Sequence, residues 1–171
     1  MDYGKVEPVN LIIHHTAGWN NPYSTVSSWN RDKRGRVATQ YVIGGTNLKT
    51  GDNEHDGIVV ETFPNNYLGW HMGKVGNFER VSKLSVGIEV CNFGYLDKKG
   101  DKYFTYVGTE VSEDMVYDLG EEFRGHRYWH KYTDKQIESL RQLIEHITKI
   151  YPKINIENGI PRLLNEGVSP I

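Results

Sequence analysis

Two adjacent histidines close the first apolar run of the sequence, and their chemistry suits a metal. The run Val9–His15 is apolar and β-branched, with turn residues on both sides, which predicts a buried strand that ends in His14 and His15. Ligands of mixed α/β sheets collect near strand ends, and a neutral imidazole is a common zinc ligand. Successive side chains on a strand point to opposite faces, so only one of the two histidines enters a given site easily. The alternative is a pair of polar residues that satisfy backbone groups at the strand end.

Glu89 is the candidate for proton transfer. It lies between Ile88 and Val90 in the run Leu84–Val90, which is typical of a buried strand. A carboxylate there is costly to bury unless it is paired or functional, and burial raises its pKa toward the range of a general base. The alternative places Glu89 on a solvent-facing side of the sheet. Gly87 in the same run indicates a bulge or a close approach of another chain segment.

Trp70 and His71 form a pair on a predicted loop. Such a pair either stacks on a sugar or peptide, or the tryptophan packs beneath the loop. The single cysteine, Cys91, is expected to be a small buried apolar residue with no base placed to activate it.

The remaining histidines carry weaker signals. His126 and His130 have the i, i+4 spacing that would chelate zinc on a helix, but the residues around them lack helical apolar spacing. His55 lies between two acidic residues and is expected to be solvated, and His146 is expected at a helix surface.

A short helix is predicted soon after the histidine pair. It covers Pro22–Asn30, with Ser24 as the N-cap and with Val26 and Trp29 facing inward. Such a helix would pack on the sheet beside the candidate site.

Further strands are predicted on both sides of the candidate residues. Gln40–Gly45 reads as a strand, and Gly57–Glu61 is expected to pair with it. Residues 95–132 are aromatic and charged, and we interpret them as an insertion with a hairpin around residues 98–101 followed by a surface loop.

The clearest helix covers Thr133–Tyr151. Thr133 and Gln136 form a capping-box pattern at its start, and Pro152 ends it. Its apolar residues lie on one stripe: Ile137, Leu140, Leu143, Ile144, Ile147 and Tyr151. Strands combined with a long amphipathic helix predict an α/β domain with a mixed sheet flanked by helices, over residues 1–171 as one domain.

Composition excludes several classes of protein. The chain has 171 residues and a formal net charge of −2, which argues against bulk electrostatic binding to nucleic acid or to a membrane. No apolar run reaches the length of a membrane helix, and Met1 is not followed by a signal-peptide pattern. One cysteine excludes a disulfide framework within the chain.

Taken together, four motifs resemble the zinc-dependent type 2 N-acetylmuramoyl-L-alanine amidases, a family that includes phage lysozyme-like amidases and peptidoglycan recognition proteins. In chain order they are LIIHHTAG, TQYVIGG, DGIVVETFPNNYLGWHMG and LSVGIEVCNFG, and they cover roughly residues 9–94. The long predicted helix also matches the C-terminal helix of that family. Because the four motifs occur in the family's order and spacing, the resemblance is more specific than any one of them.

The resemblance implies roles for individual residues. His14, rather than His15, corresponds to the family's zinc ligand, and Glu89 corresponds to its catalytic glutamate. Trp70, His71 and Thr16 would contact the substrate. Some members use a tyrosine at the position of Thr39, so the resemblance favours the glutamate mechanism here.

One departure from the family concerns zinc. The family completes its site with a histidine beyond the long helix and then a cysteine or aspartate, whereas no histidine follows His146 and the tail offers only Glu157 and Glu166. We therefore expect the amidase-like domain to lack its C-terminal portion, as part of a longer or processed amidase, or else to be a zinc-less binding relative. The remaining zinc ligands are not identifiable.

The implied function is hydrolysis of the amide between N-acetylmuramic acid and L-alanine in peptidoglycan, with one zinc ion in the complete enzyme and with Glu89 as general base. The alternatives are a peptidoglycan-binding module without catalysis and a structural component of a phage particle. The missing signal-peptide pattern fits a phage product in the host cytoplasm or virion, which would act on the cell wall. Expected partners are peptidoglycan, a missing C-terminal portion and phage-particle proteins.

Overall fold

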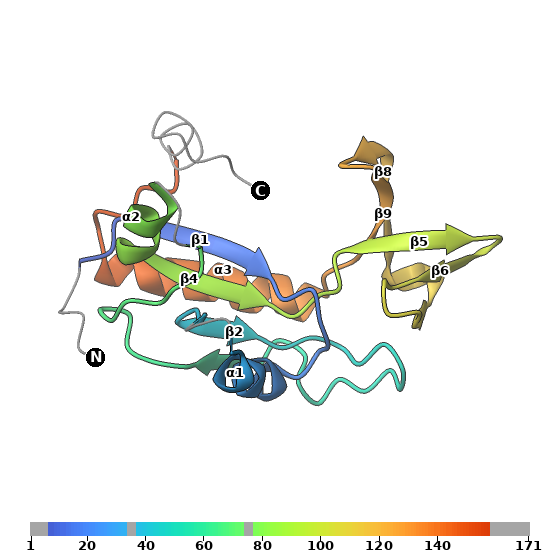
Figure 1. Ribbon diagram of the computed structural model, residues 1–171, viewed down its shortest axis with the longest axis horizontal. Helices are drawn as coiled ribbons and strands as arrows, with labels where there is room; N and C mark the ends of the chain where they lie inside the picture. Colours follow the sequence, from blue (N-terminus) through green and yellow to red (C-terminus); the bar gives the residue numbers. More distant parts are fainter. Residues whose placement is uncertain (1–6, 34–36, 74–76, 158–171) are drawn as a thin grey trace.

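The first sheet of the protein carries the strands that end in the candidate residues. The computed structural model describes residues 7–33, 37–73 and 77–157. Four strands lie side by side in the order β1 (Asn10–His15), β4 (Ser85–Val90), β2 (Tyr41–Ile43) and β3 (Val59–Glu61) (Figure 1). The first three are parallel, and β3 is antiparallel to β2. The predicted mixed sheet, including the pairing of β2 with β3, is therefore confirmed.

Helix α1 (Pro22–Arg31) confirms the predicted short helix but begins at a different cap. The side chain of Asn21, not Ser24, accepts hydrogen bonds from the backbone N–H groups of Tyr23 and Ser24, at 2.9 and 3.1 Å. Ser24 was the wrong choice because Pro22 fits the first helical position, where its missing N–H costs nothing, and this makes Asn21, directly before Pro22, the cap.

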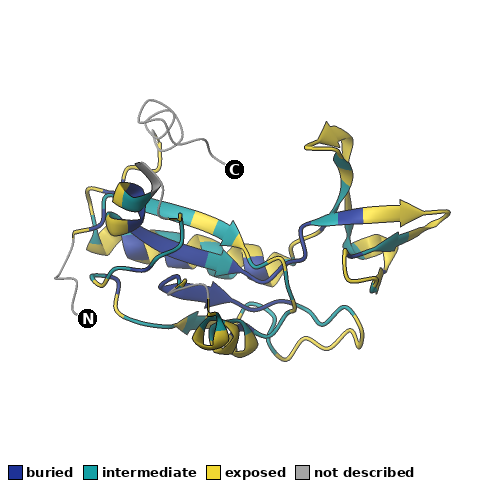
Figure 2. Cartoon of the chain, in the orientation of Figure 1, coloured by how far each residue is buried: buried dark blue, intermediate teal, exposed yellow. Residues whose placement is uncertain are grey.

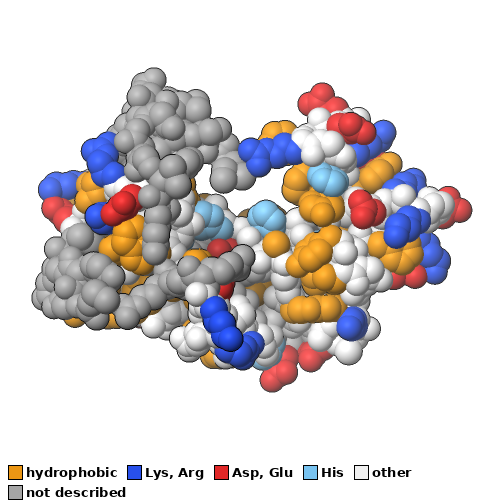
Figure 3. All heavy atoms as spheres, viewed as in Figure 1, with side chains coloured by type: hydrophobic (Ala, Val, Ile, Leu, Met, Phe, Trp, Pro, Cys, Tyr) orange, Lys and Arg blue, Asp and Glu red, His pale blue; other side chains and the backbone are white. Residues whose placement is uncertain are grey.

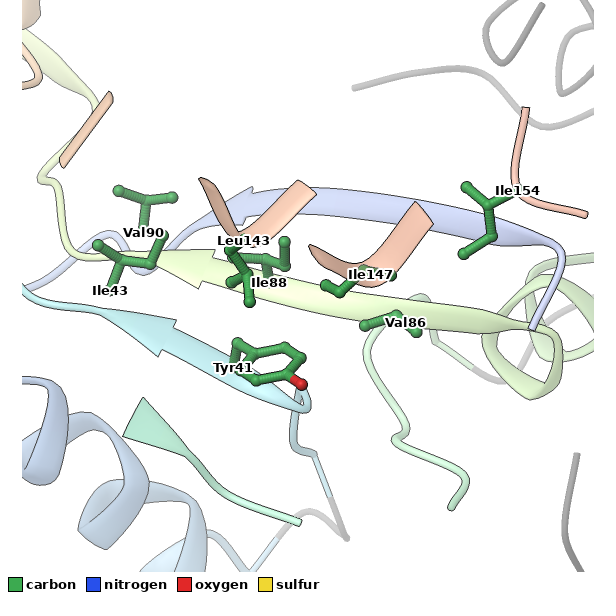
Figure 4. Close-up of a cluster of buried hydrophobic side chains, with 8 residues drawn as sticks. All are labelled: Tyr41, Ile43, Val86, Ile88, Val90, Leu143, Ile147 and Ile154. Carbon is green, nitrogen blue, oxygen red and sulfur yellow. The ribbon is translucent and has the colours of Figure 1, made fainter. Parts of the chain in front are cut away.

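Helix α3 (Asp134–Ile150) covers one face of the first sheet. Its predicted capping box is present: Thr133 Oγ1 accepts from the N–H of Gln136, and the Gln136 side chain accepts from the N–H of Thr133. The packed core between α3 and the sheet consists of Tyr41, Ile43, Val86, Ile88, Val90, Leu143, Ile147 and Ile154 (Figure 4). The expected stripe is thus largely confirmed, but Ile137 is 51% exposed because it lies in the first turn, outside this core.

The other face of the sheet is covered by shorter elements. Helix α2 (Asn77–Lys83), which the sequence did not predict, packs its buried Val81 against Ile12 and Met72. Its seven residues span only two turns, too few for a helical repeat to show in the sequence. Because side chains alternate along a strand, Ile12 and His14 share this face, whereas His15 points to the α3 side.

A second sheet is formed by the segment 95–132. Its strands lie in the order β7 (Glu110–Val111), β6 (Lys102–Phe104), β5 (Tyr95–Lys99), β9 (His126–His130) and β8 (Val116–Phe123), with a 3₁₀ turn at Glu113–Met115. The hairpin predicted around residues 98–101 is confirmed. The predicted surface loop is wrong, because β8 and β9 pair there, with a register shift between Asp118 and Phe123. Most of β8 is exposed (Figure 2), so its sequence shows no alternation of apolar and polar residues that would have predicted a strand.

The second sheet is joined to the end of the first sheet by specific contacts. The side-chain amide of Asn92 donates to the backbone oxygen of His130 at 3.0 Å, and the N–H of His130 donates to Gly94 at 2.8 Å. The Tyr106 hydroxyl donates to the backbone oxygen of Ala17 at 2.5 Å. The second sheet therefore lies against the chain segments that follow β1 and β4.

Cys91 and the histidines outside the candidate site differ in their surroundings. Cys91 is buried and His146 is exposed, as expected. His55 is half-buried rather than solvated, and its Nδ1 has no partner among the described residues. His126 and His130 lie on a strand, not a helix, which rules out the i, i+4 chelate. None of the helices in the described ranges has both the length and the apolarity needed to cross a bilayer.

Candidate active site

His14 and Glu89 occupy matching positions on neighbouring parallel strands. The register of β1 and β4 pairs His14 with Glu89, and Glu89 in turn pairs with Val42 of β2. Paired residues in a sheet project to the same face, so the imidazole and the carboxylate both lie on the side away from α3. By the same alternation His15 lies on the opposite face, and the choice of His14 as a zinc ligand, made from the family resemblance, stays a prediction.

His71 completes a chain of hydrogen bonds from His14 to Ser85. Nε2 of His14 lies 2.9 Å from Nδ1 of His71, and Nε2 of His71 lies 2.9 Å from the hydroxyl of Ser85. The two imidazole rings meet edge to face, with an interplanar angle of 77°. Sequence reasoning chose both histidines but did not place them in contact, because they lie on a strand and on a distant loop.

Both imidazoles of this pair are neutral near pH 7. Burial lowers the pKa of His71 to about 3, with a further contribution from His14, and burial together with the charge of His15 lowers the pKa of His14. Two neutral rings at 2.9 Å share one hydrogen, so one ring donates and the other accepts. The tautomer of His14 is therefore tied to that of His71 and to the direction of the Ser85 hydroxyl.

Gly87 makes room for His71 above the sheet. A Cβ atom at Gly87 would lie 2.8 Å from Cγ2 of Thr39 and 3.0 Å from Cδ2 of His71, closer than side chains tolerate. The sequence-based expectation of a close approach at this glycine is thus confirmed. Gln40 also anchors this region, because its side chain accepts from the N–H of Gly87 at 2.7 Å and donates to the backbone oxygen of Tyr67 at 3.0 Å.

Glu89 lines a cavity of about 280 Å³ between the end of β1 and helix α1. Its half-buried carboxylate has one oxygen, Oε2, with no hydrogen-bond partner among the described residues. Burial raises the pKa of Glu89 from 4.5 to about 7. A carboxylate with such a pKa, facing a cavity, can accept a proton near neutral pH and return it.

The same cavity combines residues of the first motif with residues outside the four motifs. Thr16, Ala17 and Gly18 belong to the motif, and the other lining residues are Trp19, Asn21, Ser24, Thr25, Ser28 and Trp29. Trp19 follows the histidine motif directly, and Trp29 lies about two turns into the neighbouring helix, so the aromatic content of the first thirty residues was the available signal. These rings could contact a substrate that reaches Glu89.

Comparison with known proteins identifies the chain. The sequence profile of the N-acetylmuramoyl-L-alanine amidase family matches residues 5–162. The chain belongs to this amidase family. No curated protein sequence gives a match.

Solved structures support the amidase fold. The chain is similar to AmiD of E. coli, an N-acetylmuramyl-L-alanine amidase solved with anhydro-N-acetylmuramic acid-L-Ala-D-gamma-Glu-L-Lys (TM-score 0.56, 19% identity, 99% of this chain and 61% of that one). It is also similar to AmpDh3 of Pseudomonas aeruginosa (TM-score 0.55, 16% identity, 99% and 63%) and to PlyL (TM-score 0.51, 14% identity, 97% and 81%). The chain thus spans less than two thirds of the length of the first two.

The substrate-contact residues expected for an amidase lie in different surroundings. Thr16 lines the Glu89 cavity, and its hydroxyl accepts from the N–H of Asn92 at 3.2 Å. Trp70 is half-buried, with the ammonium group of Lys83 5.8 Å from the centre of its ring. Both ring nitrogens of His71 already have partners. Substrate contact by Trp70 and His71 therefore stays a prediction.

A complete zinc site is not formed by the described residues. No group of three or more His, Cys, Asp or Glu side chains within residues 7–33, 37–73 and 77–157 could hold a metal ion. A hydrolytic zinc site takes three protein ligands, and His14 supplies one of them at most. Of the two tail residues considered as ligands, Glu157 is exposed and Glu166 lies outside the described residues.

Proposed function

We propose that the protein carrying this chain hydrolyses the amide between N-acetylmuramic acid and L-alanine in peptidoglycan, with Glu89 as the general base. The observation that carries the proposal is the half-buried Glu89 carboxylate, which faces a cavity on the same sheet face as His14. Membership of the amidase family and the resemblance to AmiD, which was solved with a muramyl peptide, support this choice of substrate.

Glu89 would act on the proton of the attacking water. The ionised carboxylate takes this proton as the water attacks the carbonyl carbon, and then transfers it to the amine of L-alanine as the amide bond breaks. A pKa of about 7 suits both transfers, because the group neither holds nor releases the proton too strongly near neutral pH. Trp19 and Trp29 line the same cavity and would help to position the substrate and exclude water.

Zinc binding is part of the proposal, with His14 as one ligand. Its ring nitrogen Nε2 already contacts His71, which leaves Nδ1 as the atom that could bind the ion. Metal content can be measured without any activity assay. The full-length protein is expected to retain zinc after dialysis, and His14→Ala is expected to lose it. Equal zinc content in both proteins would remove His14 from the ligand set.

The amidase proposal is tested by incubating the full-length protein with purified peptidoglycan and measuring new alanine amino termini. The wild type should release them, and Glu89→Gln should lower the rate at least about a hundredfold, since general-base catalysis contributes factors of this size. Glu54→Gln, a change at an exposed carboxylate in a loop, is the matched control and should keep the rate. Binding to peptidoglycan without release of amino termini would favour the non-catalytic binding module. Association with a phage stays a prediction.

A further inference from the structure

A second cavity, separate from the Glu89 cavity, lies where the second sheet meets the end of β1 and the start of α3. Its volume is about 410 Å³, within the range of small-molecule sites. Three aromatic side chains line it, from Tyr117 of β8, Trp129 of β9 and Tyr132 before α3. Figure 3 shows histidine side chains beside a band of hydrophobic side chains in the middle of the visible face. We call the cavity lined by Tyr117, Trp129 and Tyr132 the aromatic cavity.

His130 lines the aromatic cavity, and one of its ring nitrogens is a donor without a partner among the described residues. Its side chain is 8% exposed, and its Nδ1 accepts from the N–H of Phe93 at 3.2 Å. The ring is neutral because burial lowers the pKa of His130 to about 4, so the hydrogen is on Nε2. Nε2 is buried and has no partner among the described residues. A buried donor without an acceptor is costly, and an acceptor from a ligand would remove this cost.

The aromatic cavity and the Glu89 cavity are neighbours across one hydrogen-bonded pair. Asn92 lines the aromatic cavity and Thr16 lines the Glu89 cavity, and the N–H of Asn92 donates to the Thr16 hydroxyl at 3.2 Å. Burial raises the pKa of Tyr132, which lines the aromatic cavity, and the charge of Glu89 adds to this shift. The two cavities therefore lie next to each other.

We propose that the aromatic cavity is a subsite for an N-acetylated sugar ring of the glycan chain, next to the place of hydrolysis. This inference rests on the proposed function. A pyranose ring has apolar faces that pack on aromatic rings such as Tyr117 and Trp129, and its hydroxyl groups point outward to water. Its acetamido carbonyl is an acceptor of the kind that the N–H of His130 lacks.

The charge of the aromatic cavity favours a sugar over the peptide part of the substrate. Among the described residues that line it, Lys131 is the one with a full charge, and its side chain is exposed. A site built for the carboxylates of a stem peptide would be expected to hold several paired cations or buried donors. An uncharged ligand with apolar faces matches the aromatic lining better.

Calorimetric titration of the full-length protein with the tetramer of N-acetylglucosamine tests the subsite. Tyr117 is 55% exposed, so Tyr117→Ala should leave the fold intact, and it is expected to weaken binding about three- to tenfold through loss of one aromatic contact. Tyr23→Ala, at a tyrosine that is 54% exposed and does not line the cavity, is the matched control and should bind as the wild type does. No binding at millimolar tetramer, or equal binding by wild type and Tyr117→Ala, would overturn the proposal.

The same titration separates this proposal from the amidase proposal. The tetramer contains no amide to L-alanine, so its binding to the aromatic cavity can be measured whether or not the protein hydrolyses that amide. If amidase activity is absent, tetramer binding that depends on Tyr117 still supports the subsite. Titration with the peptide L-Ala-D-γ-Glu-L-Lys provides the competing outcome. Binding of the peptide, weakened by Tyr117→Ala, without binding of the tetramer would assign the cavity to the stem peptide and contradict the sugar subsite.

Discussion

Nε2 of His14 lies 2.9 Å from Nδ1 of His71, so two neutral imidazoles from distant parts of the chain share one hydrogen. The far nitrogen of His71 is held by the Ser85 hydroxyl, which lies at the start of the strand that carries Glu89. His71 therefore holds the orientation of the His14 ring, and the tautomers of the two rings depend on each other. We therefore describe His71 as a residue that positions His14.

Two substitutions of His71 separate its two contacts. An asparagine side chain places a polar atom near the position of Nδ1, whereas a glutamine side chain reaches the position of Nε2. His71→Asn should therefore keep a partner for His14 and His71→Gln a partner for Ser85. We expect His71→Gln to lower zinc affinity about ten- to a hundredfold and His71→Asn to lower it less, as measured by competition with a chelating dye.

The order of the two variants is the informative result. A merely structural role for His71 predicts that the two variants lose zinc in proportion to their loss of stability in urea. Equal zinc affinities for both variants and the wild type would show that His71 does not position His14.

Glu89→Gln is expected to lower activity at least about a hundredfold and yet to stabilise the protein at alkaline pH. The pKa of Glu89 is raised from 4.5 to about 7, so between these values the unfolded carboxyl loses its proton while the folded one keeps it. Stability of the wild type therefore falls as pH rises through this window, by about 3 kcal/mol in total. Glutamine carries no charge and removes this loss.

Urea denaturation in the presence of a chelator measures this effect. Glu89→Gln and the wild type should have similar stability near pH 4, and the variant should be the more stable of the two at pH 8. The amidase rate of the wild type should rise with pH through about 7, since only the ionised carboxylate accepts a proton. A constant stability difference from pH 4 to pH 8 would show that the folded pKa of Glu89 is not raised.

The pairing of His14 with Glu89 illustrates what the sequence could predict. Strand alternation placed each residue on one of two faces, and the order of motifs indicated the family, but the register of β1 and β4 that aligns them came from the structure. The contact between His14 and His71 depends on how a loop folds over Gly87, which no local pattern encodes. In the second sheet, the pairing of β8 with β9 was missed because β8 is exposed along most of its length, and without a buried face a strand shows no hydrophobic period.

Gly87→Ala should displace the His14–His71 pair while leaving both imidazoles chemically unchanged. The added methyl group would meet Thr39 at 2.8 Å and His71 at 3.0 Å, so the His71 loop must shift away from the sheet. We expect a loss of about 1–3 kcal/mol of unfolding free energy, as for overpacking elsewhere, together with weaker zinc binding. Gly18→Ala is the control for stability, because its Cβ would meet nothing closer than 3.6 Å. A Gly87→Ala variant as stable as Gly18→Ala would show that the loop adapts freely.

His130→Asn tests whether the imidazole in the wall of the aromatic cavity is held neutral. Asparagine retains an acceptor for the N–H of Phe93 but cannot take up a proton. The pKa of His130 is about 4 in the folded protein and 6.5 in the unfolded chain. Between these two pH values the unfolded state binds a proton at His130 and the folded state does not. This group therefore stabilises the fold fully above pH 6.5, and the contribution, about 3 kcal/mol, is lost as pH falls toward 4.

Buried His71 acts in the same direction and is unchanged in the variant, so the comparison isolates His130. The unfolding free energy of His130→Asn should fall less than that of the wild type between pH 7 and pH 4, and His146→Asn, at an exposed position on α3, should follow the wild type. Parallel pH profiles for His130→Asn and the wild type would mean that the His130 imidazole becomes protonated in the folded protein as readily as in the unfolded chain.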